Sequence, residues 1–215
     1  MDNNKTVFFI LGALQVILGL SMIFPIIVQI IYGELNGSFI SSGLIAIVIG
    51  ILFILSNLDQ NKKINLQQAF FLTSLSWISI ASFGCLPFIF SNLELTLTDA
   101  FFESMSGITT TGSTIIDDLN NAPKGILFWR AMLQWLGGIG IVVMAITLMP
   151  LMNIGGMQLF KIDSGNTSEK VLPKTKEIAL NIFTIYFFLT ILCAVSYLIA
   201  GMNIFDSIAH SMTTI

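Results

Sequence analysis

Long hydrophobic runs separated by short polar segments dominate this sequence. Five runs, at residues 6–32, 39–58, 69–90, 127–152 and 178–200, carry few charges. About 20 apolar helical residues cross the hydrocarbon core of a bilayer, so each run predicts a membrane-spanning helix. Two shorter runs, at residues 97–108 and 204–215, are about half that length. They predict re-entrant helices that enter the membrane and end inside it.

Composition supports the same fold class, an all-α integral membrane protein. The 215 residues are 55% hydrophobic and 10% charged, whereas soluble domains carry about 25% charged residues. The first run is too long for the core of a signal peptide and lacks a small-residue cleavage site, so we expect it to be retained. Cys85 and Cys193 each lie inside a spanning run with no metal-ligand spacing around them, which favours inert thiols.

The basic residues predict an orientation for the five spans. Seven lie on one side of the membrane: Lys5, Lys62, Lys63, Lys161, Lys170, Lys174 and Lys176. Only Lys124 and Arg130 belong to the other side. By the positive-inside rule, the N-terminus and both lysine-bearing loops are expected in the cytoplasm. The acidic residues then gather on the outer side, where they would raise the local cation concentration modestly: Glu34, Glu94, Asp99, Glu103, Asp117, Asp118 and Asp206.

The two short runs are related by an internal repeat. Asp99 to Met105 aligns without a gap with Asp206 to Met212, an offset of 107 residues. Thr96 and Asn203 each lie three residues before the repeated Asp, which predicts matching helix N-caps with Asp at the dipole-favoured third position. Each short run follows a spanning run, so the repeated unit is expected to be helix, pore helix, filter strand and helix.

This repeat predicts the organisation of the chain. Residues 1–66 form two leading transmembrane helices and a cytoplasmic loop, and residues 67–153 form the first pore unit. Residues 154–176 form a cytoplasmic loop, and residues 177–215 begin a second unit. The second unit stops where its filter would start, so we expect the chain to be the N-terminal part of a longer protein. One and a half units do not surround an ion.

A threonine-rich segment follows the first short run and indicates the chemistry. Dehydrated K⁺ needs a ring of oxygens, and channel filters supply backbone carbonyls from a strand at the tip of a half-membrane helix. Thr109, Thr110 and Thr111 tolerate extended backbone and carry hydroxyl oxygens. Gly112 can adopt the backbone angles that turn carbonyls toward one axis. With Ser113, these residues predict one strand of a K⁺ filter.

Arg130 and the glycines after it are further candidates. Arg130 is the one charge deep in an apolar run, so we expect either harmless snorkelling or an interior pairing with Glu103 or Asp117. Gly137, Gly138 and Gly140 lack the strand and spacing of a dinucleotide loop, which favours close helix packing. The tryptophans are expected to be packing residues or interfacial anchors. His210 stands at the repeat position of Glu103, and a buried, hydrogen-bonded histidine is favoured over a proton relay.

Several motifs resemble the TrkH/KtrB/HKT superfamily of potassium uptake proteins, most closely its bacterial TrkH branch. They are Asp99-Ala-Phe-Phe-Glu103, Ser106-Gly-Ile-Thr-Thr-Thr-Gly112, Leu127-Phe-Trp-Arg-Ala-Met-Leu-Gln-Trp-Leu-Gly-Gly-Ile-Gly140, Leu148-Met-Pro-Leu151, Gly155-Gly-Met-Gln-Leu-Phe160 and Phe205-Asp-Ser-Ile-Ala-His-Ser211. The resemblance covers essentially the whole chain. It implies four such units around one pore in the complete protein, preceded in TrkH-type members by two leading helices.

The resemblance also implies site residues and partners. K⁺ would be coordinated by the carbonyls of Thr110 and Thr111, with Gly112 and Ser113 completing the strand. Candidate pore-supporting residues are Thr109, Arg130, Glu103 and Asp99. One glycine per filter strand implies a shorter and less selective binding column than in tetrameric channels. The implied setting is a multi-pass protein of the bacterial inner membrane that forms homodimers and binds a cytosolic nucleotide-sensing ring of RCK domains.

The sequence excludes some functions and leaves two alternatives open. No Ser/His/Asp grouping, metal spacing or phosphate loop occurs, so neither an enzyme nor a cofactor is expected, K⁺ being the transported ion; no nucleic-acid partner is expected either. Broken helices also occur in secondary transporters of other solutes, although many of those have inverted repeats. The second alternative is a non-conducting membrane fragment that serves in assembly.

Overall fold

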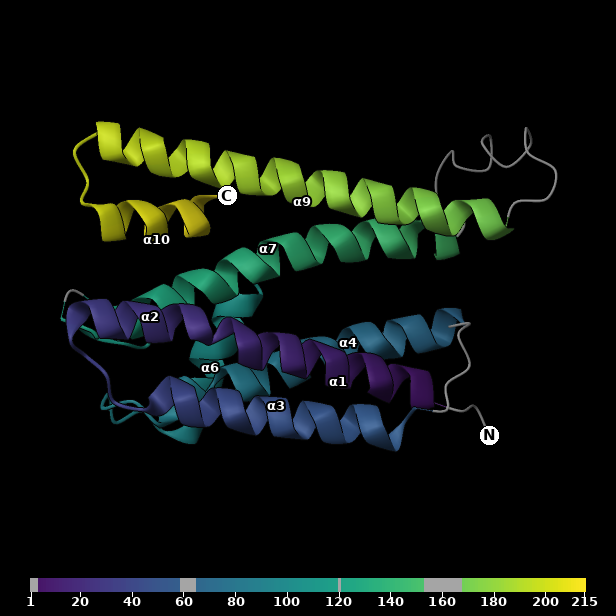
Figure 1. Ribbon diagram of the computed structural model, residues 1–215, viewed down its shortest axis with the longest axis horizontal. Coiled ribbons are helices and arrows are strands. Elements are labelled where there is room, and N and C mark those ends of the chain that lie inside the picture. Colours follow the sequence, from purple (N-terminus) through teal and green to yellow (C-terminus); the bar gives the residue numbers. More distant parts are fainter. Residues whose placement is uncertain (1–3, 59–64, 120, 153–167) are drawn as a thin grey trace. The chain divides into compact units, whose positions relative to one another are not determined.

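The computed structural model describes residues 4–58, 65–119, 121–152 and 168–215, with side chains described outside residues 146–176. Every regular element in these ranges is a helix (Figure 1). In chain order the helices are α1 (Lys5–Ser21), α2 (Ile23–Tyr32), α3 (Ser38–Ser56), α4 (Leu66–Gly84), α5 (Leu86–Ile89), α6 (Leu97–Ile108), α7 (Lys124–Met152), α9 (Ser168–Ile199) and α10 (Ile204–Thr214). The all-α fold class is therefore confirmed.

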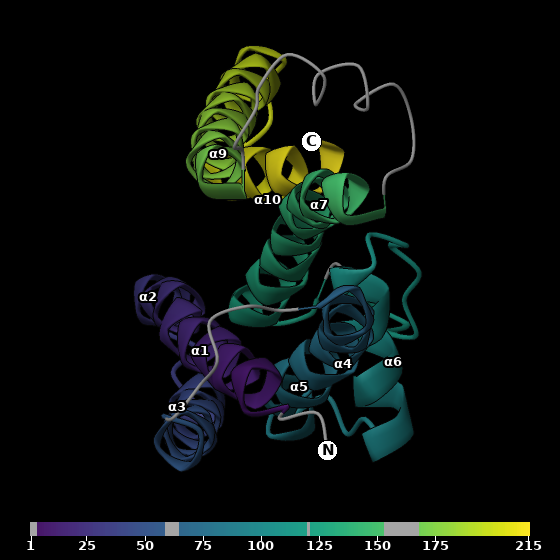
Figure 2. The same ribbon diagram turned by 90° about the vertical axis from the view of Figure 1, so that its right-hand side faces the viewer.

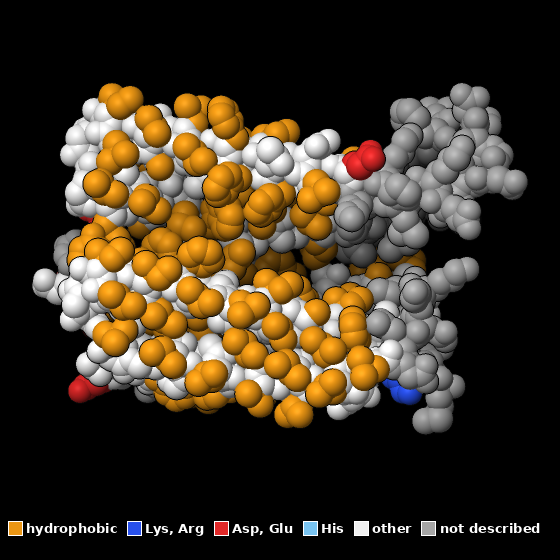
Figure 3. Space-filling model, in the orientation of Figure 1, with side chains coloured by type: hydrophobic (Ala, Val, Ile, Leu, Met, Phe, Trp, Pro, Cys, Tyr) orange, Lys and Arg blue, Asp and Glu red, His pale blue; other side chains and the backbone are white. Residues whose placement is uncertain are grey.

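Five helical segments are long and apolar enough to cross a membrane: Lys5–Tyr32, Ser38–Ser56, Leu66–Ile89, Lys124–Ala145 and Glu177–Ile199. Four of them match a predicted run to within three residues, and the remaining one, Lys124–Ala145, lies within α7, which extends to Met152 as the run at 127–152 predicts. Figure 3 shows one face that is covered mostly by hydrophobic side chains, with the few visible charged groups toward the left and right sides of the view. Such a surface would be unstable in water but suits lipid, so the chain is a multi-pass membrane protein.

The described residues form two compact units, Met1–Gly137 and Gly138–Ile215. In the first unit, α1 packs against both α3 and α4 (Figures 1 and 2). Glycines bring the backbones of α1 and α3 together. An added Cβ at Gly12 would lie 2.7 Å from the carbonyl oxygen of Gly50, and one at Gly19 would lie 2.8 Å from that of Gly43. Small residues allow this approach where no water drives helix association.

Prolines break two of the spanning helices. Pro25 lies one turn beyond Ser21, where α1 ends, and cannot donate to its carbonyl. Pro87 marks the change from α4 to α5, and the amide of Phe88 donates to Cys85 instead of Gly84. The freed carbonyl of Gly84 accepts the buried indole N–H of Trp129 at 2.9 Å. Trp129 thus ties α7 to the break in α4, a contact that the sequence did not reveal.

The second unit contains a helical hairpin of α9 and α10, joined at Gly201 with φ +96°. The hydroxyls of Tyr197 and Thr214 lie 2.9 Å apart across it. Helix α9 begins at Ser168, so residues 168–176 of the predicted loop at 154–176 are helical, while the membrane-length segment begins at Glu177. Residues 153–167, including Lys161, lie outside the described part, as do Lys62, Lys63 and the side chains of Lys170, Lys174 and Lys176.

Candidate functional site

The half-length helix α6 is set by signals at both of its ends. Thr96 caps the N-terminus: its hydroxyl accepts from the Asp99 amide at 3.2 Å, and the Asp99 carboxylate accepts from the Thr96 amide. Both predicted caps are confirmed, because the Asn203 side chain accepts from the Asp206 amide at 2.8 Å in α10. Asp99, a candidate pore-supporting residue, thus lies at the start of α6, 13 residues before Gly112.

The C-terminus of α6 is closed by a Schellman motif with an unusual residue. The amide of Thr111 donates to the Ser106 carbonyl at 3.0 Å, and that of Thr110 donates to the Gly107 carbonyl at 2.9 Å. The left-handed position, usually glycine, is occupied by Thr110 with φ +58°. This conformation costs a β-branched residue about 1–3 kcal/mol and concentrates at functional sites. Backbone strain therefore occurs within the predicted filter.

Beyond this turn, the candidate filter continues through Gly112 and Ser113. Gly112 has the positive φ expected from the sequence, at +76°. Among the described residues, no hydrogen bond reaches the carbonyls of Thr110, Thr111 or Gly112, whereas the Ser113 carbonyl accepts from the Ser106 hydroxyl at 2.6 Å. The hydroxyls of Thr109 and Thr111 pair with each other at 2.9 Å. Three successive carbonyl oxygens remain available for an external ligand.

Glu103 lies behind this strand and links it to α7. The residue is 1% exposed. One carboxylate oxygen of Glu103 accepts from the Nε of Arg130. The sequence left two possible partners for Arg130, Glu103 and Asp117, and the structure pairs it with Glu103. The other oxygen accepts from the Thr114 hydroxyl and the Ile115 amide, both at 3.1 Å. Glu103 is therefore not part of an acidic outer surface, contrary to the sequence-based expectation.

Helix α7 also supports the tip of α6 directly. A Cβ added at Gly137 would lie 1.9 Å from the carbonyl oxygen of Ile108, the last residue of α6. One added at Gly107 would lie 3.1 Å from Cβ of Leu133. The close packing predicted for Gly137 is confirmed, and a Cβ added at Gly138 would likewise lie 2.6 Å from the Tyr186 hydroxyl. At Gly140 the predicted close packing is not observed, because no described residue lies within 4 Å of an added Cβ. The filter segment thus rests on a tightly packed helix crossing.

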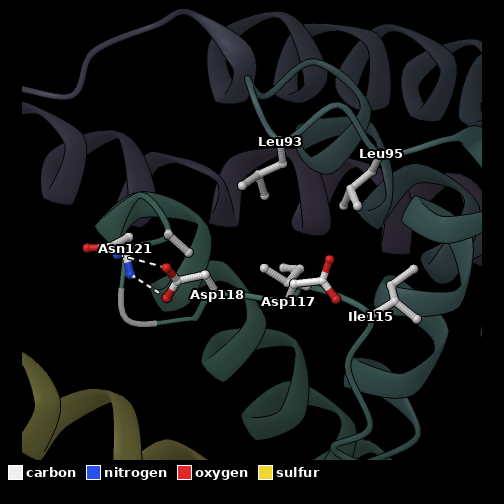
Figure 4. A pocket seen from close by; sticks show the side chains of 8 residues that line it. Leu93, Leu95, Ile115, Asp117, Asp118 and Asn121 are labelled. Atoms are coloured by element: carbon white, nitrogen blue, oxygen red, sulfur yellow. Dashed lines mark hydrogen bonds between the residues drawn. The ribbon is translucent and has the colours of Figure 1, made fainter.

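Asp117 and Asp118 do not take part in the ion pair between Glu103 and Arg130. They line a pocket of about 320 Å³ with Leu93, Leu95 and Ile115. Figure 4 shows Asp117 among these apolar side chains, whereas Asp118 accepts from the Asn121 side chain at 2.7 Å. No group of three or more metal-ligating side chains occurs within the part of the chain that the structure describes.

His210, at the repeat position of Glu103, is placed differently. It is exposed within its unit and lies edge-on to Tyr197, with ring centroids 6.3 Å apart. The expected buried histidine is therefore not observed in the second unit. His210 makes no carboxylate contact among the described residues.

Comparison with known proteins yields one family and several close relatives. The family described as "TrkH: Cation transport protein" matches residues 36–215. The Trk system potassium uptake protein TrkH of Escherichia coli (strain K12) is 40% identical over 210 residues, which are 96% of this chain and 44% of that protein. The Trk system potassium uptake protein TrkI of Halomonas elongata is 40% identical over 209 residues, covering 96% of this chain and 42% of that protein.

A solved structure shares the fold. The crystal structure of the potassium transporter TrkH from Vibrio parahaemolyticus matches with a TM-score of 0.86 and 35% identity, over 99% of this chain and 42% of that chain. The chain therefore spans less than half the length of these relatives and corresponds to their N-terminal part.

Proposed function

Because the chain belongs to the TrkH family of cation transport proteins, we propose that it forms the N-terminal part of a potassium-conducting subunit and supplies the first strand of its filter. K⁺ is the transported ion and is coordinated by the carbonyls of Thr110 and Thr111, with Gly112 and Ser113 completing the strand. The subunit is a transporter and performs no chemical conversion.

One observation carries this proposal: three consecutive carbonyls without hydrogen-bond partners among the described residues, at the tip of a half-length helix. The negative end of the α6 dipole favours a cation at that tip. Backbone carbonyls replace the water shell of K⁺ in known filters. The positive φ of Gly112 is the local feature that turns the strand toward this role.

The proposal extends to the setting of the protein. The complete subunit is a homodimer in the bacterial inner membrane, with its N-terminus in the cytoplasm, and it binds an RCK-type nucleotide-binding ring from the cytosolic side. The relatives are named as components of a Trk system, and the basic residues are biased toward one side. A cysteine placed at Asn121 should react with an impermeant thiol reagent added outside, and one at Asn65 should not. The opposite labelling pattern would reverse the orientation.

Substitutions at Gly112 test the filter. They are made at the native locus, so that the protein is studied as the cell makes it, in a strain lacking other K⁺ uptake. Gly112→Val should abolish ⁸⁶Rb⁺ uptake at normal abundance, because a β-branched residue at φ +76° costs about 1–3 kcal/mol or turns the carbonyls away. Gly112→Ala should be milder and should weaken K⁺ preference first.

Two threonine variants separate backbone from side-chain roles. Thr111→Val keeps the carbonyl and removes the hydroxyl, so uptake should fall less than in Gly112→Val. Thr110→Gly should keep the turn and relieve its strain, leaving uptake largely intact. Unchanged uptake in Gly112→Val would remove the segment from the ion path and favour a secondary transporter of another solute.

A further inference from the structure

The contacts of Glu103 exceed what a bridge between two helices needs. Arg130 alone would neutralise the carboxylate and join α6 to α7. Instead the second carboxylate oxygen accepts two hydrogen bonds from Thr114 and Ile115, the residues that directly follow the candidate filter. The carboxylate is fully buried, and each of its oxygens has a partner. It therefore joins three segments at one point: α6, α7 and the strand that leaves the filter.

Both ends of the filter are thereby fixed to the same helix. The near end is fixed by the amides of Thr111 and Gly112, which donate to the Ser106 carbonyl. The far end is fixed by Ser106, which donates to the Ser113 carbonyl, and by Glu103. The carbonyls between these anchors carry no hydrogen bond from the described residues. The spacing of the anchors on α6 then sets where those carbonyls lie.

We propose that Glu103 is a positioning residue for ion discrimination: with Arg130 holding its carboxylate in place, it anchors the end of the filter strand through Thr114 and Ile115. The proposal rests on the proposed function. Glu103 acts without touching the ion, and it adds no net charge beside the pore because its charge is balanced by Arg130. Its effect is geometric, on the radius at which carbonyl oxygens meet a cation.

The second copy of the repeat does not carry this carboxylate. His210 occupies the aligned position in α10, and a neutral imidazole has one acceptor nitrogen and no oxygen, so it cannot accept the three contacts that Glu103 makes.

The decisive experiment compares loss of the carboxylate with exchange of the two charges. ⁸⁶Rb⁺ and ²²Na⁺ uptake and protein abundance are measured in cells carrying each variant at the native locus. Glu103→Gln should raise the Na⁺ to Rb⁺ uptake ratio about tenfold, because the single amide oxygen cannot serve both Arg130 and the strand, and the charge that strengthens both contacts is removed. Glu94→Gln is the matched control, because its exposed carboxylate lies in the segment before α6; its ratio should equal that of the parent.

The variant with the two charges exchanged, E103R/R130E, separates the bridge between α6 and α7 from the anchoring of the filter strand. It can rebuild the bridge between α6 and α7, but an arginine at position 103 offers only donors to the Thr114 hydroxyl and Ile115 amide. Abundance should therefore recover while discrimination stays lost. Thr114→Val removes one of the two hydrogen bonds from the strand to Glu103, together with the bond that the Thr114 hydroxyl accepts from the Ile116 amide, and should give a smaller shift, of about threefold.

Two results would overturn the proposal. Full recovery of the uptake ratio in E103R/R130E would show that the pair is only a bridge between helices. A Glu103→Gln protein with low abundance and a parental ratio would show the same. Lack of Rb⁺ uptake in the parent would instead contradict the proposed function, and the positioning role with it.

Discussion

Helices α6 and α10 begin alike and end in different surroundings. Each has a polar N-cap, Thr96 or Asn203, and an Asp at the third helical position. In α6, the residues Ala100, Glu103, Ser104, Gly107 and Ile108 are buried, whereas in α10 the position aligned with Glu103 is an exposed His210. The caps are local and repeat with the sequence. Burial depends on what packs against the helix, so aligned positions carry different chemistry.

The largest expected effect on stability comes from disturbing the close packing of α7 against the end of α6. Gly137→Ala should destabilise the protein by about 3 kcal/mol or more, since its Cβ would lie 1.9 Å from the Ile108 carbonyl oxygen. The melting temperature in detergent measures this. Gly140→Ala is the control on the same helix, because nothing among the described residues lies within 4 Å of its Cβ. Equal melting temperatures for the two variants would contradict the packing argument.

Loss of the Trp129 hydrogen bond should have the next largest effect. Trp129→Phe leaves the Gly84 carbonyl without its donor at the α4 break, which costs about 1–3 kcal/mol. Trp77→Phe provides the comparison, since Trp77 is half-buried and makes no recorded hydrogen bond in the described part of the chain. Its cost should stay within about 0.5 kcal/mol. A Trp129 variant as stable as the Trp77 variant would show that the indole N–H contributes nothing.

The caps should show the smallest effects and sharpen the comparison most directly. Thr96→Ala and Asn203→Ala each remove about 1 kcal/mol of capping. Hydrogen exchange at the first turn should accelerate about fivefold in α10. The same acceleration is expected at the first turn of α6, because both first turns have a polar cap and include a buried residue, Ala100 in α6 and Phe205 in α10. A much larger acceleration in one helix than in the other would contradict a purely local role for the caps.

The helical segments and their limits follow from local sequence. Runs of apolar residues, the Thr96 and Asn203 caps and the left-handed Gly112 could all be predicted, because each depends on neighbours within about one helical turn. The predicted roles of Thr110, Thr111 and Ser113 in the filter remain predictions, and the Ser113 carbonyl accepts from the Ser106 hydroxyl.

Only the tertiary structure decided the partners. It paired Arg130 with Glu103 instead of Asp117, gave Trp129 the carbonyl of Gly84, and placed Thr110 in a glycine position. These choices depend on which side chain meets which freed backbone group across the helices. In a membrane interior, where no water satisfies a buried polar group, that spatial match decides which contact forms. Sequence spacing along one helix does not contain this information.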